Sequence, residues 1–220
     1  MAWQAAGVAS TPIGAAILDE QGEIIALARN ATRGAPTGGM PYAGSYVAHA
    51  EINAIGQIHV ERRLDGCTLL TTLLPCVMCA GAAAMAHVGR VRYLAPDPVL
   101  PRIATLAEVS EIVRTQWPRY ELRPADEWTV ASLVLAASSK ARAKPDGLVM
   151  AAHRRSEPEV AELLRVHAHN ALMAEAQAHV PIEHALALIW DDIVAAATRR
   201  GRRLANLGNR APSSERGEPP

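Results

Sequence analysis

The segment Leu70-Thr-Thr-Leu-Leu-Pro-Cys-Val-Met-Cys-Ala-Gly-Ala-Ala83 passes from a short β-rich stretch into a helix that Pro75 opens. Cys76 and Cys79 lie three positions apart at the start of this helix, so both sulfurs should project from the same side. The positive end of the helix dipole lowers the pKa of thiols placed there and favours the thiolates that zinc requires. The segment therefore predicts a strand, a helix and two ligands of a metal site.

A second segment, His49-Ala-Glu-Ile-Asn-Ala-Ile55, opens a helical pattern upstream and supplies a histidine for the same site. His-x-Glu followed by Pro-Cys-x-x-Cys is the signature of zinc-dependent nucleobase deaminases. His49, Cys76 and Cys79 would leave one tetrahedral position of zinc open, where water has its pKa lowered toward about 7. Glu51 could reach this water without coordinating the metal, and we predict that it is the general acid and base. The predicted reaction takes in water and an aminated ring and releases ammonia.

Each motif alone has a plainer interpretation. A lone Cys-x-x-Cys can be redox-active or structural, and a lone His-Ala-Glu occurs by chance. A structural zinc site would need a fourth ligand, and Cys67 is the only other cysteine of the chain. Cys67 starts a predicted strand, where buried packing is its expected role. Because both motifs open helices in the required order, and Pro75 directly precedes Cys76, we favour the catalytic metal site.

The surrounding sequence alternates strands with helices. Strands are predicted at 13–18 and 24–28, paired as a hairpin around Asp19-Glu-Gln-Gly22, and then at 67–72, 91–94 and 120–123. Helices are predicted from His49 to about Val60, at 76–86, 103–113 and 128–141, and a loop at 32–45. This alternation indicates an α/β fold that is complete near residue 142.

Beyond residue 142 the sequence indicates helices alone. A hinge-like stretch at 140–147 precedes two amphipathic patterns, one over 160–172 and one from Pro181 to about 204. We predict a zinc-dependent deaminase domain at 1–142, a helical extension at 143–210 and a flexible tail at 211–220. Two amphipathic helices cannot stand alone, so their apolar sides should be buried against the core or a partner subunit. We expect them to support assembly and to supply no catalytic group.

Composition and charge disfavour several classes of partner. The 22 basic residues balance 22 acidic residues, and 50% of the chain is hydrophobic, so neither disorder nor a polyanion partner is indicated. Charges interrupt the apolar stretches before they reach the length of a membrane span, and the N-terminus lacks the pattern of a secretory signal. Three cysteines, an odd number, do not suggest a disulfide framework. We expect a cytoplasmic protein without membrane contact.

These residues resemble the cytidine deaminase-like superfamily, most closely its branch of tRNA adenosine deaminases, guanine deaminases and nucleoside deaminases. The resemblance covers about residues 14–141 and includes Val88-Gly-Arg-Val-Arg-Tyr93 behind the two motifs. It implies a three-layer α/β/α fold around a five-stranded mixed sheet, with zinc at the ends of two helices, and a homodimer or larger homo-oligomer. It also implies that Asn30 hydrogen-bonds the substrate and that backbone amides near Ala50 and Cys76 help to bind the ring.

The sequence departs from this family pattern in three places. Leu74 stands where members commonly have a glutamate before the Pro-Cys pair. That glutamate is neither a zinc ligand nor the proton carrier, so we expect activity with altered local contacts or substrate choice. The loop between Asn30 and His49 is longer than in tRNA-editing members, and the helical extension has no counterpart in the resemblance.

Several side chains outside the motifs have two interpretations. Tyr42 and Tyr46, in the loop before the zinc histidine, could stack on a base or anchor the loop. Trp128 could close the pocket, although a core or interface role is favoured. Asn53 is expected to cap or stabilise its helix.

Basic side chains near the end of the chain also have a functional and a plainer interpretation. Four arginines could contact phosphates, although their placement at a helix C-terminus, which the helix dipole favours, is the preferred explanation. They are Arg199, Arg200, Arg202 and Arg203. His59, His87 and the histidines beyond residue 142 lack ligand spacing and are interpreted as surface or packing residues.

Three functions are compatible with the sequence. A deaminase of a free base, nucleoside or nucleotide is favoured by the neutral charge and by a long loop that could cover a small pocket. A tRNA adenosine (A-to-I) editing deaminase is supported by the Pro-Cys-Val-Met-Cys-Ala-Gly run but weakened by the lack of a broad basic face. A non-catalytic zinc-stabilised module is disfavoured by Glu51. We favour the first, with guanine, adenine, cytosine and a modified ring all open.

Overall fold

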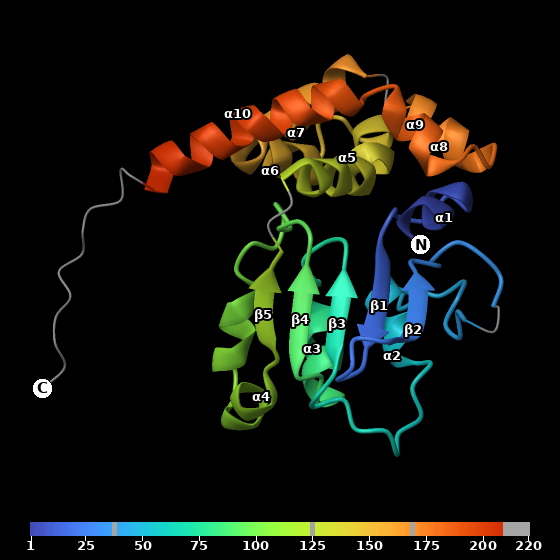
Figure 1. Ribbon diagram of the computed structural model, residues 1–220, viewed down its shortest axis with the longest axis vertical. Helices are drawn as coiled ribbons and strands as arrows, with labels where there is room; N and C mark the ends of the chain where they lie inside the picture. Colours follow the sequence, from blue (N-terminus) through green and yellow to red (C-terminus); the bar gives the residue numbers. More distant parts are fainter. Residues whose placement is uncertain (37–38, 124–125, 168–169, 209–220) are drawn as a thin grey trace, which may run out of the picture.

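A mixed five-stranded sheet organises the first part of the chain (Figure 1). The computed structural model describes residues 1–36, 39–123, 126–167 and 170–208. Within them the strands are β1 (Gly14–Leu18), β2 (Ile24–Arg29), β3 (Thr68–Thr71), β4 (Arg90–Tyr93) and β5 (Arg119–Leu122), in the spatial order β2-β1-β3-β4-β5. β1 is antiparallel to β2 and β3, whereas β3, β4 and β5 are parallel. Each predicted strand is present, with its ends within one residue of the expected positions.

The hairpin between β1 and β2 is closed by its turn residues, as predicted. Oδ1 of Asp19 accepts hydrogen bonds from the backbone N–H groups of Gln21 at 3.1 Å and Glu23 at 2.9 Å. Gly22 has a φ of +87°, a conformation that glycine adopts without the penalty of a Cβ atom. The turn therefore fixes the register in which the first two strands pair.

Helices α2 (Ala50–Ile55) and α3 (Val77–Met85) cover one face of the sheet. Their alanines allow close packing on the apolar strand residues Ile17, Leu69 and Val91, all fully buried. α2 is shorter than predicted: it ends before Ile58, and Val60 is 93% exposed, so the expectation that these two residues lie on a partly buried helix is wrong. The predicted helix at 103–113 is instead a 3₁₀ helix, η1 (Ile103–Glu108), followed by α4 (Glu111–Gln116), because Ser110 caps a new helix.

A second group of helices lies across the carboxyl ends of β3, β4 and β5 (Figure 1). It contains α1 (Ala2–Gly7), α5 (Asp126–Ala143), α6 (Leu148–Ser156), α7 (Pro158–Val166), α8 (Asn170–Gln177), α9 (Ile182–Ala187) and α10 (Trp190–Gly208). The helical character of the extension is confirmed, but each predicted amphipathic pattern is divided between two helices. The backbone of His167 turns extended after α7, and a short turn at Leu188 separates α9 from α10.

Helix α5 belongs to this second group. Its residues Val130, Leu133 and Val134 are buried in one cluster with Val160 of α7 and Ile193 of α10. The apolar side chains expected to face the core or a partner are buried in the same cluster, namely Leu163, Leu172, Leu186 and Ile189. The α/β class, the mixed sheet and the C-terminal helices are confirmed. The expected second helical layer on the sheet is incomplete, because α5 packs on the extension at the strand ends. Leu27, on the sheet face that α2 and α3 do not cover, is 43% exposed.

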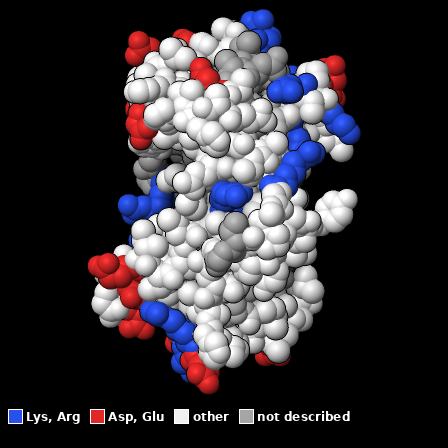
Figure 2. Space-filling view, turned by 90° about the vertical axis from the view of Figure 1, so that its right-hand side faces the viewer, with Lys and Arg blue, Asp and Glu red and all other residues white. Residues whose placement is uncertain are grey.

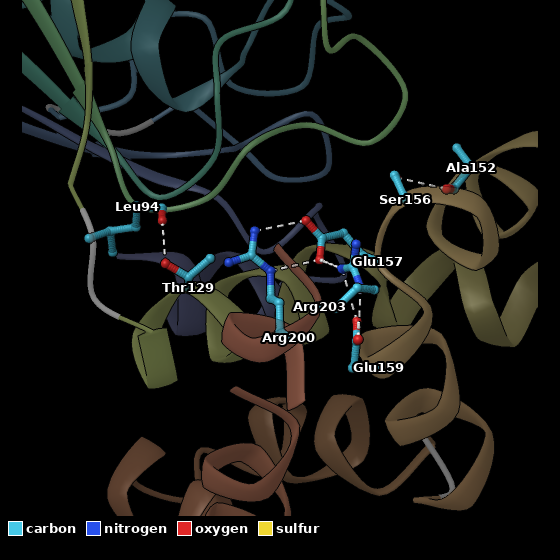
Figure 3. Close-up of polar contacts among 8 residues, drawn as sticks. All are labelled: Leu94, Thr129, Ala152, Ser156, Glu157, Glu159, Arg200 and Arg203. Carbon is cyan, nitrogen blue, oxygen red and sulfur yellow. Dashed lines mark hydrogen bonds and ion pairs between the residues drawn. The ribbon is translucent and has the colours of Figure 1, made fainter. Parts of the chain in front are cut away.

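Hydrogen bonds join the second group of helices to the sheet and to one another (Figure 3). Oγ1 of Thr129, near the start of α5, donates to the carbonyl oxygen of Leu94 after β4 at 2.7 Å. Nε1 of Trp3 in α1 donates to the carbonyl oxygen of Val180 at 2.7 Å, which ties the N-terminal helix to the extension. The boundary near residue 142 stays a prediction, and the expected tail at 211–220 lies outside the described residues. None of the helices within the described ranges has the length and apolar character needed to span a membrane.

Two residues of the arginine cluster, Arg200 and Arg203, are part of this packing, whereas Arg199 and Arg202 are exposed. The sequence predicts that the four arginines lie at a helix C-terminus. This prediction is wrong, because α10 continues to Gly208 and the arginines lie within the helix. Arg200 makes a bidentate ion pair with Glu157, at 2.7 and 2.9 Å, and both side chains are buried (Figure 3). Arg203 pairs in the same way with Glu159, at 2.8 and 3.0 Å. These two guanidinium groups are committed to carboxylates and do not form a phosphate-binding surface.

Arg200→Ala should lower the melting temperature by roughly 6 to 20 °C. Removing Arg200 leaves the buried Glu157 with only the longer contact to Arg203, at 3.4 Å. Breaking a buried pair costs about 3 to 5 kcal/mol, and about 1 kcal/mol shifts the midpoint of a domain of this size by roughly 2 to 4 °C. Thermal unfolding followed by circular dichroism measures the effect. The matched control is Arg165→Ala, which removes the exposed bidentate partner of Glu162 and should barely shift the midpoint. Equal shifts for the two variants would contradict a stabilising role of the buried pair.

Candidate metal centre and pocket

Two helix N-termini meet at the carboxyl end of β3. His49 is the N-cap of α2 and Cys76 is the N-cap of α3, and both have extended backbone conformations. Cys79 lies one turn into α3, so its sulfur is on the same side as that of Cys76. The fold therefore brings together the three side chains that the sequence predicts as ligands.

The spacing of the three donor atoms fits a zinc ion. Nδ1 of His49 lies 3.5 Å from Sγ of Cys76 and 3.5 Å from Sγ of Cys79, and the two sulfurs are 3.6 Å apart. Zn–S bonds of about 2.3 Å and Zn–N bonds of about 2.0 to 2.1 Å in a tetrahedron place such atoms roughly 3.6 to 3.8 Å apart. Among the described residues this is the one group of histidine, cysteine and acidic side chains that could hold a metal ion.

The two cysteines share a hydrogen bond that makes one of them acidic. Sγ of Cys76 and Sγ of Cys79 are 3.6 Å apart, and the hydrogen bond between them lowers the pKa of Cys76 to about 4. The same hydrogen bond, together with burial, raises the pKa of Cys79 above its ordinary value. The hydrogen bond to Cys76 raises the pKa of His49. The pair therefore offers a thiolate to an incoming cation.

Glu51 lies beside the three candidate ligands and is held by its own contacts. Its side chain is buried, its Oε1 accepts a hydrogen bond from Oγ1 of Thr71 at 3.3 Å, and its Oε2 lies 3.4 Å from Sγ of Cys79. Burial is the main cause of a raised pKa for this carboxyl group. A carboxyl group with a raised pKa, next to a metal site, is suited to accept and return a proton.

A cavity of about 240 Å³ opens beside this centre. His49, Glu51 and Cys76 form one wall of it. The rest of the lining is mostly apolar and comes from the segment before β1, the loops after β3 and β4, and helices α5 and α6. These residues are Thr11, Ile13, Leu73, Leu74, Asp97, Pro98, Val99, Ala136, Lys140, Val149 and His153.

Comparison with known proteins identifies the family. Residues 1–95 match the model of the cytidine and deoxycytidylate deaminase zinc-binding region. Over 125 residues the chain is 34% identical to the tRNA-specific adenosine deaminase of Aquifex aeolicus, an alignment that covers 53% of this chain and 76% of that protein. The chain belongs to the cytidine deaminase-like superfamily. Zinc is the cofactor that this family region binds, and the His49, Cys76 and Cys79 cluster could bind a metal ion.

Other relatives match only about half of the chain. The chain is 34% identical over 120 residues to the tRNA(Ile)-lysidine synthase of Deinococcus radiodurans, but it spans only 19% of that protein's length. A chain solved in a study of A-to-I editing by tRNA:A34 deaminases is 28% identical, with a TM-score of 0.45, and the match covers 56% of this chain and 90% of that chain.

None of the four predicted substrate contacts is among the residues that line this cavity. Oδ1 of Asn30 accepts hydrogen bonds from the backbone N–H and the hydroxyl of Thr32, and Ala50 is fully buried at the start of α2. Tyr46 is 97% exposed. Tyr42 lines a different cavity at the other end of α2. Their contacts with substrate stay predictions.

Three further residues considered in the sequence make structural contacts, namely Asn53, Cys67 and Trp128. Asn53 is fully buried, accepts from the backbone N–H of Tyr42 at 3.2 Å and donates to the carbonyl oxygen of Arg29 at 3.3 Å, so it joins its helix to the long loop and to β2. Cys67 is buried in the core beneath the sheet, as predicted. Trp128 is 51% exposed and packs on Trp190, with ring centroids 5.1 Å apart, so it belongs neither to the core nor to the lining of the cavity.

Several residues that line the cavity could not be predicted from the sequence. Asp97, Lys140 and His153 reach it from a loop and from two helices beyond the motifs. His153 is 4% exposed, so it is a buried residue of the pocket wall and not one of the unremarkable histidines of the extension. No local spacing marks it, because His49 and Glu51, which line the same cavity, lie about 100 residues earlier in the sequence.

Proposed function

We propose that this chain is a zinc-dependent aminohydrolase that deaminates a nucleobase in a small molecule, as a free base, nucleoside or nucleotide. The observation that carries the proposal is the cavity at Glu51 and Cys76, which α5 and α6 enclose on the side away from the sheet. Its volume of about 240 Å³ is below the roughly 300 to 1,000 Å³ typical of drug-sized ligand sites. A small, largely apolar cavity suits a single planar ring better than an RNA loop.

Each residue at the end of the cavity has a role in this reaction. His49, Cys76 and Cys79 hold the zinc ion, which when bound supplies Lewis acidity that makes water nucleophilic at neutral pH. Glu51 takes a proton from the attacking water, delivers it to the ring nitrogen next to the carbon under attack, and then helps ammonia to leave. The hydroxyl of Thr71 holds one oxygen of the Glu51 carboxylate, which orients the other.

The apolar lining supports binding of an uncharged ring. Leu74, which replaces the family's common glutamate, is buried and faces the cavity together with Ile13 and Val99. Apolar walls exclude water from the space around the ring and strengthen the electrostatic interactions made by Glu51. We propose that Leu74 shapes this part of the pocket for a ring edge without charge.

A second candidate function is deamination of adenosine in tRNA. The 34% identity to the Aquifex aeolicus tRNA-specific adenosine deaminase favours it. The charge balance does not: 22 basic residues match 22 acidic ones, and on the face drawn in Figure 2 Lys and Arg lie in separate small groups on a largely uncharged surface. Binding of a polyanion relies on many cationic contacts to phosphate, which a dispersed distribution supplies poorly.

A substrate panel should distinguish the two functions. The zinc-loaded protein is incubated with guanine, adenine and cytosine as bases, nucleosides and nucleotides, and ammonia release is measured. In parallel, unmodified tRNA is incubated with the protein and analysed for inosine. We expect turnover of at least one small compound and no inosine. Inosine in tRNA without turnover of any small compound would replace the first function by the second, and failure of both arms would contradict a nucleobase deaminase.

A further inference from the structure

One wall of the cavity beside the metal centre comes from α5 and from the first helix of the extension, α6. Ala136 and Lys140 of α5 and Val149 and His153 of α6 line it. These residues lie outside the part of the chain that matches the deaminase family model, which ends at residue 95. The extension therefore completes the pocket, whereas the sequence led us to expect only a role in assembly.

His153 has a buried ring nitrogen without a partner. Nδ1 lies 2.9 Å from the carbonyl oxygen of Val149, and because a carbonyl oxygen only accepts, Nδ1 carries the proton. Nε2 of the neutral ring is then an acceptor. It is buried and lacks a hydrogen-bond partner in the described part of the chain. Such a group is destabilising unless a donor reaches it, so it calls for a functional explanation.

Nε2 of His153 differs from the other polar groups around the cavity in its lack of a partner within the described ranges. Five buried side-chain atoms among the described residues lack a hydrogen-bond partner, and only the one on His153 belongs to a residue that lines this cavity. Asp97, by contrast, already accepts from the backbone N–H of Val99 at 2.8 Å. Lys140 is exposed and makes none of the ion pairs found among the described residues.

We propose that Nε2 of His153 accepts a hydrogen bond from an N–H or O–H group of the substrate, and that His153 is a specificity-determining residue. The proposal rests on the proposed function. The amine to be removed must meet the wall formed by the ends of α2 and α3. His153 belongs to the wall formed by α6, so it contacts a different part of the same molecule. The donor is either a ring N–H of the base or a hydroxyl of the sugar.

The test compares variants that keep or remove the acceptor. His153→Phe and His153→Leu remove it and retain apolar bulk, and His153→Gln places a carbonyl oxygen near the position of Nε2. His167→Phe is the matched control, because this histidine of the extension hydrogen-bonds Asp192 at 2.7 Å and is not among the residues that line the cavity. Zinc content and thermal unfolding confirm that each variant is folded and loaded.

We expect kcat/KM for the best compound of the panel to fall about five- to 150-fold in His153→Phe and His153→Leu, since the substrate donor is left unpaired. His153→Gln should recover much of the loss, and His167→Phe should match the wild type. A set of analogues locates the donor: N-methylated bases remove a ring N–H, and deoxynucleosides remove a hydroxyl. With the wild type, kcat/KM should be lower for the analogue that lacks the donor than for the parent compound. With His153→Phe, the analogue and the parent compound should have the same kcat/KM.

The outcomes separate this inference from the proposed function. If the wild type deaminates no compound of the panel, the proposed function fails and this inference falls with it. If the wild type is active and folded His153→Phe and His153→Leu retain its kcat/KM for every compound, the inference alone is overturned. The analogue series on the wild type covers the case in which the variants do not fold: equal activity toward every analogue would also overturn it.

Discussion

Glu51→Gln should leave zinc bound and the fold intact but lower kcat by about two to four powers of ten. Glutamine has nearly the same volume and can still accept the hydrogen bond from Thr71, which lies 3.3 Å from the carboxylate. It cannot take a proton from water or return one to the ring. Ammonia release from the best compound of the panel measures the rate, and metal analysis of the same sample measures zinc.

The control for this variant is Glu61→Gln, which makes the same chemical change in a side chain that is 88% exposed. Its kcat should equal that of the wild type. A wild-type rate in Glu51→Gln would refute the proton-transfer role. Loss of zinc from Glu51→Gln would instead show that the carboxylate contributes to metal binding.

The metal centre could be predicted from the sequence because its chemistry is encoded locally. Cys76 and Cys79 are three residues apart on one helix, and His49 and Glu51 are two residues apart on another, so each pair is fixed by helix geometry alone. The strands were predictable for a similar reason: β-rich runs and turn residues such as Gly22 act over a few positions. Local patterns do not show that the two helix ends lie side by side. That part of the prediction came from the resemblance to a known family.

The pocket wall could not be predicted because it depends on packing between distant segments. Trp128 to Ala141 forms a helix as expected, but the position of α5 is decided by partners such as Val160 and Ile193. His153 enters the cavity only because α6 follows α5 in that position. The contacts of the arginine cluster could not be predicted for the same reason. Arg200 finds its carboxylate on Glu157, 43 residues earlier, which no local pattern indicates.

Cys79→Ser should reduce zinc from about one per chain to near zero and abolish ammonia release at the same time. Cys79 is fully buried and its sulfur lies within 3.6 Å of both other donors, so serine fits the same space while removing the thiolate. His49 and Cys76 alone would hold zinc weakly. Cys67→Ser is the matched control, because this cysteine is equally enclosed by the core but lies outside the cluster.

Zinc is measured by elemental analysis after gel filtration, together with ammonia release, for the wild type and both variants. Chelation of wild-type zinc should remove activity, and added zinc should restore it to the wild type and to Cys67→Ser but not to Cys79→Ser. Because Cys79 lies on a helix that also packs against the sheet, circular dichroism must show a retained fold before the loss is assigned to the metal. Wild-type zinc content and rate in a folded Cys79→Ser variant would refute the three-ligand centre.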